Sequence, residues 1–165
     1  MIRDAYFAGG CFWCITPVFE ETDGVVSVRC GYSGGSEDDA VYEKVKSQQT
    51  LHRETLRVTY DDGVISYGDL LDIFLSSVDP FDGGGQFIDR GRSYTLAVFF
   101  GSEREKNEVT AKLKKLETER NRTVFVSVEG FVSFYDAEEY HQDYYLKNPE
   151  AFEKELEESG RKKAT

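Results

Sequence analysis

The sequence predicts an α+β fold, a ferredoxin-like α/β plait in which an antiparallel sheet carries helices on one face. Two observations predict it. Apolar patterns with strand and helix periods alternate along the chain in the order β-α-β-β-α-β. The usual packing of that order is a four-stranded antiparallel sheet with both crossover helices on one face. An additional helix, strand and irregular tail follow this core, and no linker divides residues 1–165, so a single domain is expected.

The first expected strand is the apolar run Ala5 to Ala8, which a double glycine separates from a helix. Pro17 leaves the start of that helix open. A helix that begins at Phe12 loses an intrahelical hydrogen bond at Pro17. A helix that Thr16 caps begins at Pro17 instead, and the preceding cysteines then lie in a separate turn.

Alternating patterns predict the next two strands, Val25 to Cys30 and His52 to Tyr60. Between them lies an acidic, glycine-rich loop in which one helical turn is expected after Ala40. Ser66 to Asp69 resembles a capping box, and the helix behind it buries a leucine-rich face. This helix is expected to end before Asp79-Pro80.

The second half of the chain continues with a glycine-rich loop and the apolar strand Tyr94 to Phe100. Ser102 caps a charged surface helix. The segments Val124 to Val128 and Phe131 to Tyr135 predict a hairpin or a broken strand. The acidic, aromatic tail from Ala137 to Glu158 is expected to be helical in part.

Composition limits the partners and the compartment. A net charge of −11 makes nucleic acid an unsuitable partner and leaves no polybasic membrane anchor. No stretch is apolar and long enough to cross a bilayer, and the N-terminus leads into a strand rather than a signal peptide. Three cysteines without a spaced framework indicate functional thiols in a reducing compartment. We therefore expect a cytoplasmic monomer.

Two of the three cysteines lie in the stretch Cys11-Phe12-Trp13-Cys14, directly after Gly9-Gly10. A cysteine at a strand–helix turn meets free backbone N–H groups and the positive end of the helix dipole. Both favour the thiolate, which is the nucleophilic form. The alternative is a small apolar residue at a turn. The CxxC spacing and the flanking aromatic residues favour a reactive thiol.

Strand direction predicts which side chains gather at one end of the sheet. The first two strands run one way and the other two run back, because parallel crossovers are right-handed. The residues expected at this end are Cys11, Cys30, His52, Glu54, Asp89 and Tyr94.

Glu54 shares a strand face with apolar residues, so its carboxyl is expected to be partly desolvated and to have a raised pKa. Such a group can act as a general acid; the alternative is a glutamate that extends into solvent. His52 with the cysteines does not complete a zinc pattern, so neither a metal nor another cofactor is predicted. His141 in the tail is expected to be a hydrogen-bonded packing residue.

An ordered set of motifs resembles the peptide methionine sulfoxide reductase A family over roughly Ala5 to Pro149. The motifs are Gly10-Cys11-Phe12-Trp13, Gly24-Val25, Gly31-Tyr32-Ser33-Gly34-Gly35, Tyr42-Glu43-x-Val45, His52-x-Glu54, Ser66-Tyr67-x-x-Leu70-Leu71, Asp79-Pro80, Asp89-x-Gly91, Tyr94 and Phe134-Tyr135-x-Ala137-Glu138-x-Tyr140-His141-Gln142.

The resemblance implies reduction of methionine sulfoxide, free or in proteins, with preference for the S epimer. By resemblance, Cys11 attacks the sulfoxide sulfur and Glu54 protonates the oxygen. Phe12 and Trp13 wall an apolar pocket for the methyl group. The matching family residues that complete the site are Tyr42 and Tyr94, which hydrogen-bond the oxygen, and Asp89, which lies in the pocket. Cys11 is left as a sulfenic acid, which condenses with a second thiol.

The chain departs from the family pattern at Cys14, Thr16, Leu51, Ser93 and Thr95, and its sequence has no cysteine after Tyr145. Cys14 is therefore favoured as the resolving thiol, with reduction by thioredoxin or a similar dithiol. Cys30 is the alternative, but it is expected roughly 9–10 Å from Cys11, two strand spacings away. That distance exceeds the roughly 7 Å limit for a disulfide. Direct reduction by an external thiol is a third possibility.

Two other functions compete with sulfoxide reduction. A general CxxC dithiol–disulfide oxidoreductase would use Cys11 and Cys14 but would not need Glu54, Tyr42 or Tyr94. A non-catalytic ferredoxin-like module would bind a protein or a metal, and its function would survive replacement of Cys11.

Overall fold

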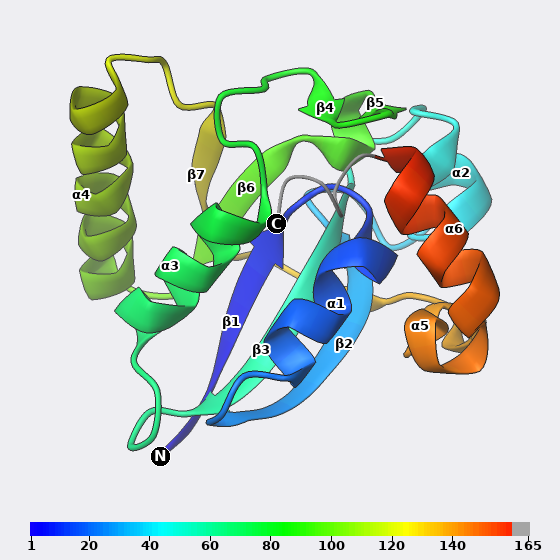
Figure 1. Ribbon diagram of the computed structural model, residues 1–165, viewed down its shortest axis with the longest axis horizontal. Coiled ribbons are helices and arrows are strands. Elements are labelled where there is room, and N and C mark those ends of the chain that lie inside the picture. The colour runs from blue at the N-terminus through cyan, green and yellow to red at the C-terminus, as the bar shows by residue number, and fades with distance from the viewer. Residues whose placement is uncertain (160–165) are drawn as a thin grey trace.

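A computed structural model describes residues 1–159 of the chain (Figure 1). The strands of its main sheet are β1 (Ile2–Ala8), β2 (Val25–Ser33), β3 (Arg53–Asp61), β6 (Leu96–Phe100), β7 (Val126–Gly130) and β8 (Tyr135–Asp136). A separate two-stranded hairpin consists of β4 (Gly85–Gln86) and β5 (Asp89–Arg90). The helices are α1 (Phe12–Glu20), α2 (Tyr42–Lys46), α3 (Tyr67–Ser77), α4 (Glu103–Arg120), α5 (Tyr144–Lys147) and α6 (Pro149–Ser159), with 3₁₀ turns η1 (Arg92–Tyr94) and η2 (Glu139–His141).

The sheet has the strand order β7-β6-β1-β3-β2-β8, and every neighbouring pair is antiparallel except β6 and β7. Helices α1 and α3 lie on the same face of this sheet (Figure 1). Fully buried residues such as Phe7, Leu56 and Phe74 fill the layer between them. The predicted α+β class with a mostly antiparallel sheet is confirmed. No helix among residues 1–159 is long and apolar enough to cross a membrane.

Helix α1 begins at Phe12, so the first of the two possible starts is correct. Cys11 occupies the N-cap position, Cys14 lies in the first turn, and Pro17 lies inside the helix. The loss of one backbone donor at Pro17 is tolerated because α1 buries Ile15 and Phe19 against the sheet. The predicted turn after Ala40 is α2, and Ser66 and Asp69 form the predicted capping box of α3.

Strand β2 is longer than predicted and ends at Ser33 rather than at Cys30. Gly31, which reads as a loop residue, pairs with Thr55 of β3 and with Asp136 of β8. Cys30 pairs with Leu56 and therefore lies inside the sheet, away from its end. Tyr94 lies in the η1 turn before β6, not in the strand itself.

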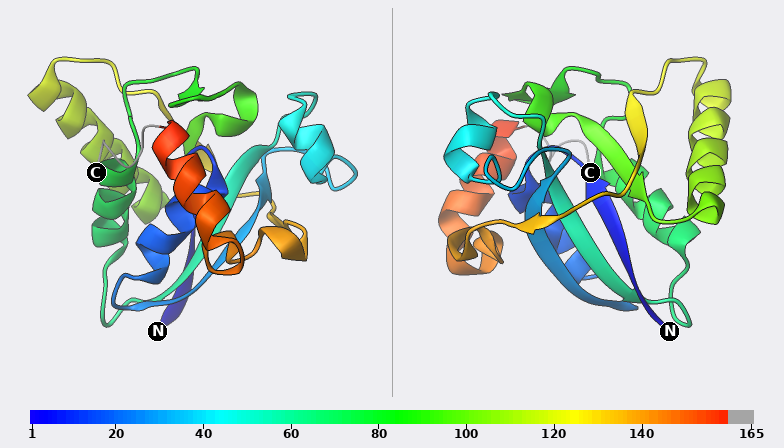
Figure 2. Two further views of the ribbon diagram at one scale, coloured as in Figure 1. Left: turned by 45° about the vertical axis from the view of Figure 1, so that its right-hand side comes forward. Right: turned by 180° about the vertical axis from the view of Figure 1, so that it is seen from behind.

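The segments around residues 124–135 form neither the predicted hairpin nor a single broken strand, because they give two separate strands at opposite edges of the sheet. β7 pairs in parallel with β6 at one edge of the sheet, and β8 pairs with β2 at the other. Figure 2 shows the connecting segment crossing the face opposite the helices. Phe131 stacks on Tyr6 there, with ring centroids 4.0 Å apart. Its apolar residues therefore cover the sheet instead of pairing with each other.

Candidate active site

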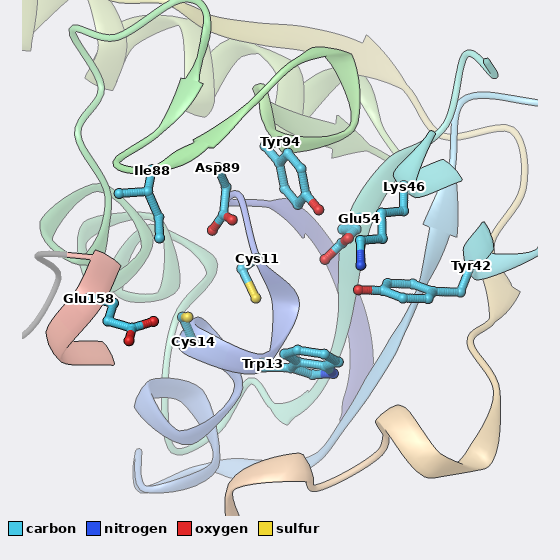
Figure 3. Close-up of a pocket in the computed structure, with 10 residues that line it drawn as sticks. All are labelled: Cys11, Trp13, Cys14, Tyr42, Lys46, Glu54, Ile88, Asp89, Tyr94 and Glu158. Atoms are coloured by element: carbon cyan, nitrogen blue, oxygen red, sulfur yellow. The ribbon is translucent and has the colours of Figure 1, made fainter. Parts of the chain in front are cut away.

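A pocket of about 220 Å³ opens where β1 ends and β3 begins. The β4–β5 hairpin, α2 and the end of α6 surround it (Figure 3). Its lining residues are Cys11, Trp13, Cys14, Tyr42, Lys46, Glu54, Ile88, Asp89, Tyr94 and Glu158. The pocket thus brings together five residues that were predicted as catalytic from sequence.

Cys11 lies at the bottom of this pocket and is 9% exposed. Its pKa is raised well above the usual value, first by a hydrogen bond with the Cys14 thiol and then by burial. The nearby carboxyls of Glu54 and Asp89 act in the same direction. The expectation that the helix start favours the thiolate is therefore wrong for the substrate-free protein. The free N–H of Phe12 donates to Glu54 Oε1 at 3.1 Å, so this helix donor serves the carboxyl.

Glu54 is the second residue of β3 and is 2% exposed. Two influences on its protonation oppose each other, because burial disfavours the carboxylate while the Phe12 N–H donor favours it. Tyr94 lies beside it in the pocket. Burial, followed by the charge of Glu54, raises the pKa of the Tyr94 hydroxyl. That hydroxyl therefore stays protonated and can donate a hydrogen bond to a ligand.

The indole of Trp13 forms one wall of the pocket, and the C-terminal segment holds it in place. Its Nε1–H donates to His141 Nδ1 at 3.0 Å, and its ring stacks on Tyr144 with centroids 4.0 Å apart. Phe12, predicted as a second wall, does not line the pocket: it is 1% exposed and packs behind Trp13 against Tyr32. The first residue of α1 points down onto the sheet, which explains the difference.

His141 is fully buried among aromatic rings, as a packing residue would be. Burial lowers its pKa to about 4, so the imidazole is neutral at physiological pH. Because Nδ1 accepts the Trp13 hydrogen bond, the proton is on Nε2. This buried atom has no hydrogen-bond partner within the described part of the chain.

Two residues expected at this end of the sheet are not in the pocket. His52 is buried under the loop after β2, where it accepts from Gly35 N–H and donates to the Ser36 carbonyl. Cys30 lies beneath α1, with its sulfur 3.3 Å from Thr16 Oγ1, and burial raises its pKa to about 12. Across residues 1–159, no cluster of His, Cys, Asp or Glu could hold a metal ion.

Three lining residues were missed from sequence: Lys46, Ile88 and Glu158. Lys46 follows Tyr42 by four residues, a spacing that puts both on one helix face, so α2 could have revealed it. Ile88 directly precedes Asp89. No local signal identifies Glu158, because its position depends on how α6 folds back over α1.

A pocket that combines a buried cysteine pair with a carboxyl and phenol donors is typical of a thiol-dependent oxidoreductase. The family model described as peptide methionine sulfoxide reductase matches residues 3–165. The chain therefore belongs to the peptide methionine sulfoxide reductase family and is an enzyme that reduces methionine sulfoxide.

Individual relatives agree. Peptide methionine sulfoxide reductase MsrA of Ligilactobacillus salivarius is 42% identical over 159 residues, which cover 94% of this chain and 91% of the relative. Among solved structures, reduced Mxr1 from Saccharomyces cerevisiae is 29% identical with a TM-score of 0.85, over 90% of this chain and 86% of that one. The same yeast protein in complex with Trx2 is 23% identical with a TM-score of 0.61, covering 87% and 84%.

Proposed function

We propose that this pocket reduces the S epimer of methionine sulfoxide, free or within peptides and proteins, by attack of Cys11 on the sulfoxide sulfur. The convergence of Cys11, Glu54 and Tyr94 on one small pocket carries the proposal. Figure 3 shows the Cys11 sulfur directed among the lining side chains, with the oxygen atoms of Glu54 and Tyr94 together on one side of it. The methyl group of the substrate lies against Trp13, which Phe12 supports from behind.

The proposed step balances without a cofactor. The sulfoxide loses its oxygen and is reduced by two electrons, while Cys11 gains that oxygen and becomes a sulfenic acid. The thiol proton passes through Glu54 to the transferred oxygen. Tyr42 and Tyr94 donate hydrogen bonds to this oxygen as negative charge develops on it. Because a hydrogen bond with Cys14 and burial raise the pKa of Cys11 in the free pocket, the thiol is protonated before the attack and its proton leaves during that step.

Cys14 is proposed as the thiol that resolves the sulfenic acid, forming a Cys11–Cys14 disulfide and releasing water. Its position one helical turn from Cys11, with its thiol hydrogen-bonded to that of Cys11, supports this role. Cys30 has its sulfur against Thr16 and Phe12 O beneath the helix, and not in the pocket. The disulfide is then reduced by thioredoxin, the kind of partner with which yeast Mxr1 has been solved.

The wider expectations belong to the same proposal: one domain over residues 1–165, a cytoplasmic monomer, and a core of the ferredoxin-like type. The strand order β6-β1-β3-β2, with α1 and α3 on one face, supports the last of these. Asp89 is proposed to orient the substrate from the β4–β5 hairpin.

Turnover of both epimers of a blocked methionine sulfoxide, with dithiothreitol as reductant, tests the chemistry. Cys11→Ser should abolish S-epimer reduction, and Glu54→Gln should lower kcat by about 10²–10⁴. Cys30→Ser is the matched control and should retain activity. Full activity in Glu54→Gln would contradict the acid role of Glu54, whereas no sulfoxide reduction by the wild type would favour a simple dithiol oxidoreductase. Activity in Cys11→Ser would favour a function that does not involve this thiol.

A thioredoxin-coupled assay tests the resolving step. Cys14→Ser should complete one turnover and then stop, with Cys11 trapped as a sulfenic acid that dimedone labels. Cys30→Ser should continue to cycle. The opposite result, in which Cys30→Ser stalls and Cys14→Ser cycles, would assign resolution to Cys30. Continued cycling by both variants would indicate direct reduction by the external thiol.

A further inference from the structure

Two oppositely charged side chains flank the pocket, and neither takes part in the proposed transfer of oxygen. Lys46 is the last residue of α2, and Glu158 lies in the last turn of α6. In Figure 3 the ammonium group of Lys46 points into the pocket beside Tyr42, and the carboxylate of Glu158 lies on the opposite side, beyond Cys14. A substrate seated over Cys11 therefore has a cation on one flank and an anion on the other.

Lys46 is the one cationic side chain in the lining of the pocket, as far as the structure describes the chain. It is exposed, and its Nζ lies 5.7 Å from the centroid of the Tyr42 ring. Among the side chains that the structure describes, no carboxylate forms an ion pair with it. Its charge is thus available to an incoming group and is directed toward the pocket by contact with Tyr42.

Glu158 is also available. Its side chain is 59% exposed and forms an ion pair with the exposed Lys154 one turn earlier, at 4.0 Å. Exposed helix pairs of this kind are weak, so they compete little with a ligand. Helix α6 is anchored by the buried ring of Phe152, which packs near Tyr145. Glu158 is therefore held at the rim of the pocket and not simply on a loose tail.

The placement of these charges selects among substrates. Free methionine sulfoxide carries its ammonium and carboxylate on the same carbon atom, so it cannot present them to opposite sides of Cys11. A peptide that lies across the pocket places the residues before and after the methionine sulfoxide on opposite flanks. Complementary charges at such a rim set specificity more than overall affinity.

We propose that Lys46 and Glu158 read the residues on either side of methionine sulfoxide in a peptide, favouring an acidic side chain at Lys46 and a basic one at Glu158. This inference rests on the proposed function, because it requires the sulfoxide to lie over Cys11. Both residues are specificity determinants, and neither is a catalytic residue.

Two peptides of equal composition and opposite order test the idea: acetyl-Asp-methionine sulfoxide-Lys-amide and acetyl-Lys-methionine sulfoxide-Asp-amide. The wild type should prefer one order by about 4- to 25-fold in kcat/KM, since each of the two exposed ion pairs is worth roughly two- to fivefold. Lys46→Gln and Glu158→Gln should each reduce the preference, and the double variant Lys46→Glu/Glu158→Lys should reverse it. The preference should shrink in 1 M salt, where the screening length is about 3 Å.

Control variants and a neutral peptide distinguish charge recognition by Lys46 and Glu158 from the reduction of the sulfoxide itself. Lys44→Gln and Glu157→Gln remove the same charges from α2 and α6 outside the pocket lining and should keep the wild-type preference. A neutral peptide with glycine on both sides should be reduced equally by all variants. Failure of the wild type to reduce that neutral peptide would reject the proposed function itself.

Equal rates for the two orders in the wild type, with the neutral peptide reduced normally, would overturn the inference alone. If the preference for one peptide order survives Glu158→Gln but disappears in Asp89→Asn, the assignment of Glu158 is overturned. Asp89 would then be the residue that recognises the basic side chain of the peptide. A preference retained by the double charge reversal would show that neither residue reads the peptide.

Discussion

Replacement of His141 by phenylalanine should flatten the pH dependence of stability on the acid side of neutrality. The imidazole has a pKa of about 4 in the folded protein and 6.5 as a free side chain, because it is buried. Between these values the unfolded chain binds more protons than the folded one, so stability falls as pH falls. The contribution of neutral His141 is complete above pH 6.5 and is lost progressively toward pH 4.

The magnitude follows from these two pKa values. Linkage gives a loss of about 2 kcal/mol between pH 7 and pH 5 for a single group with this shift. His141→Phe keeps the ring contacts with Tyr42 and Tyr140 but cannot titrate. It also leaves Trp13 Nε1 without its acceptor, which costs roughly 1 kcal/mol at every pH. Because this cost is the same at every pH, it does not change how the unfolding free energy varies with pH.

Urea unfolding at several pH values measures the effect, followed by circular dichroism and by the fluorescence of Trp13, the single tryptophan of the sequence. The difference in unfolding free energy, wild type minus His141→Phe, should change by about 2 kcal/mol in favour of the variant from pH 7 to pH 5. Subtraction removes the contributions of groups that do not interact with His141, whereas Glu138, which interacts electrostatically with His141, contributes to the difference. Parallel pH curves for the two proteins would refute the reasoning.

Three further predictions follow from buried or crowded positions. Cys30, with a pKa raised from 9.0 to about 12, should react with iodoacetamide about 1,000-fold more slowly in the native protein than a model thiol, as peptide mapping would show; rapid native labelling would contradict its placement. Gly31→Ala should destabilise the protein by about 1–3 kcal/mol in urea unfolding, because a Cβ there would overlap the Phe134 ring. Gly101→Ala, whose nearest neighbour is 3.6 Å away, is the control, and equal effects would argue against crowding. Burial, followed by a hydrogen bond with Asp143, raises the pKa of Glu20 to about 7, so the folded state binds the extra proton between pH 4.5 and 7. Glu20→Gln should therefore gain stability relative to wild type as pH rises through 7, and an unchanged difference in unfolding free energy from pH 5 to 8 would refute this.

Local patterns were sufficient where a short stretch of chain decides its own structure. The capping box at Ser66 marks the start of α3 because its two hydrogen bonds involve only neighbouring residues. Strand direction was enough to bring Cys11 and Glu54 to the same end of the sheet, because it follows from the handedness of the crossovers. The presence of a cysteine and a glutamate at this end of the sheet therefore indicated thiol and acid chemistry from the sequence.

Positions that depend on distant contacts could not be predicted. The first residue of α1 donates its backbone N–H to Glu54, a residue 42 positions away, and no local pattern reveals that contact. Gly31 continues β2 because strands lie on both sides of it, although glycine alone suggests a turn. The raised pKa of Cys11 likewise comes from Cys14 and from burial, which outweigh the helix dipole considered from sequence.

The segment that runs from β7 to β8 supplies the outermost strand at both ends of the main sheet. Unpaired strand edges are where folded proteins recruit other chains into intermolecular sheets. Here both edges consist of short strands, five residues in β7 and two in β8, with Glu129 on the first and Asp136 on the second. Detachment of this one segment would expose β6 and β2 together, so aggregation of the protein would begin with a local opening and not with global unfolding.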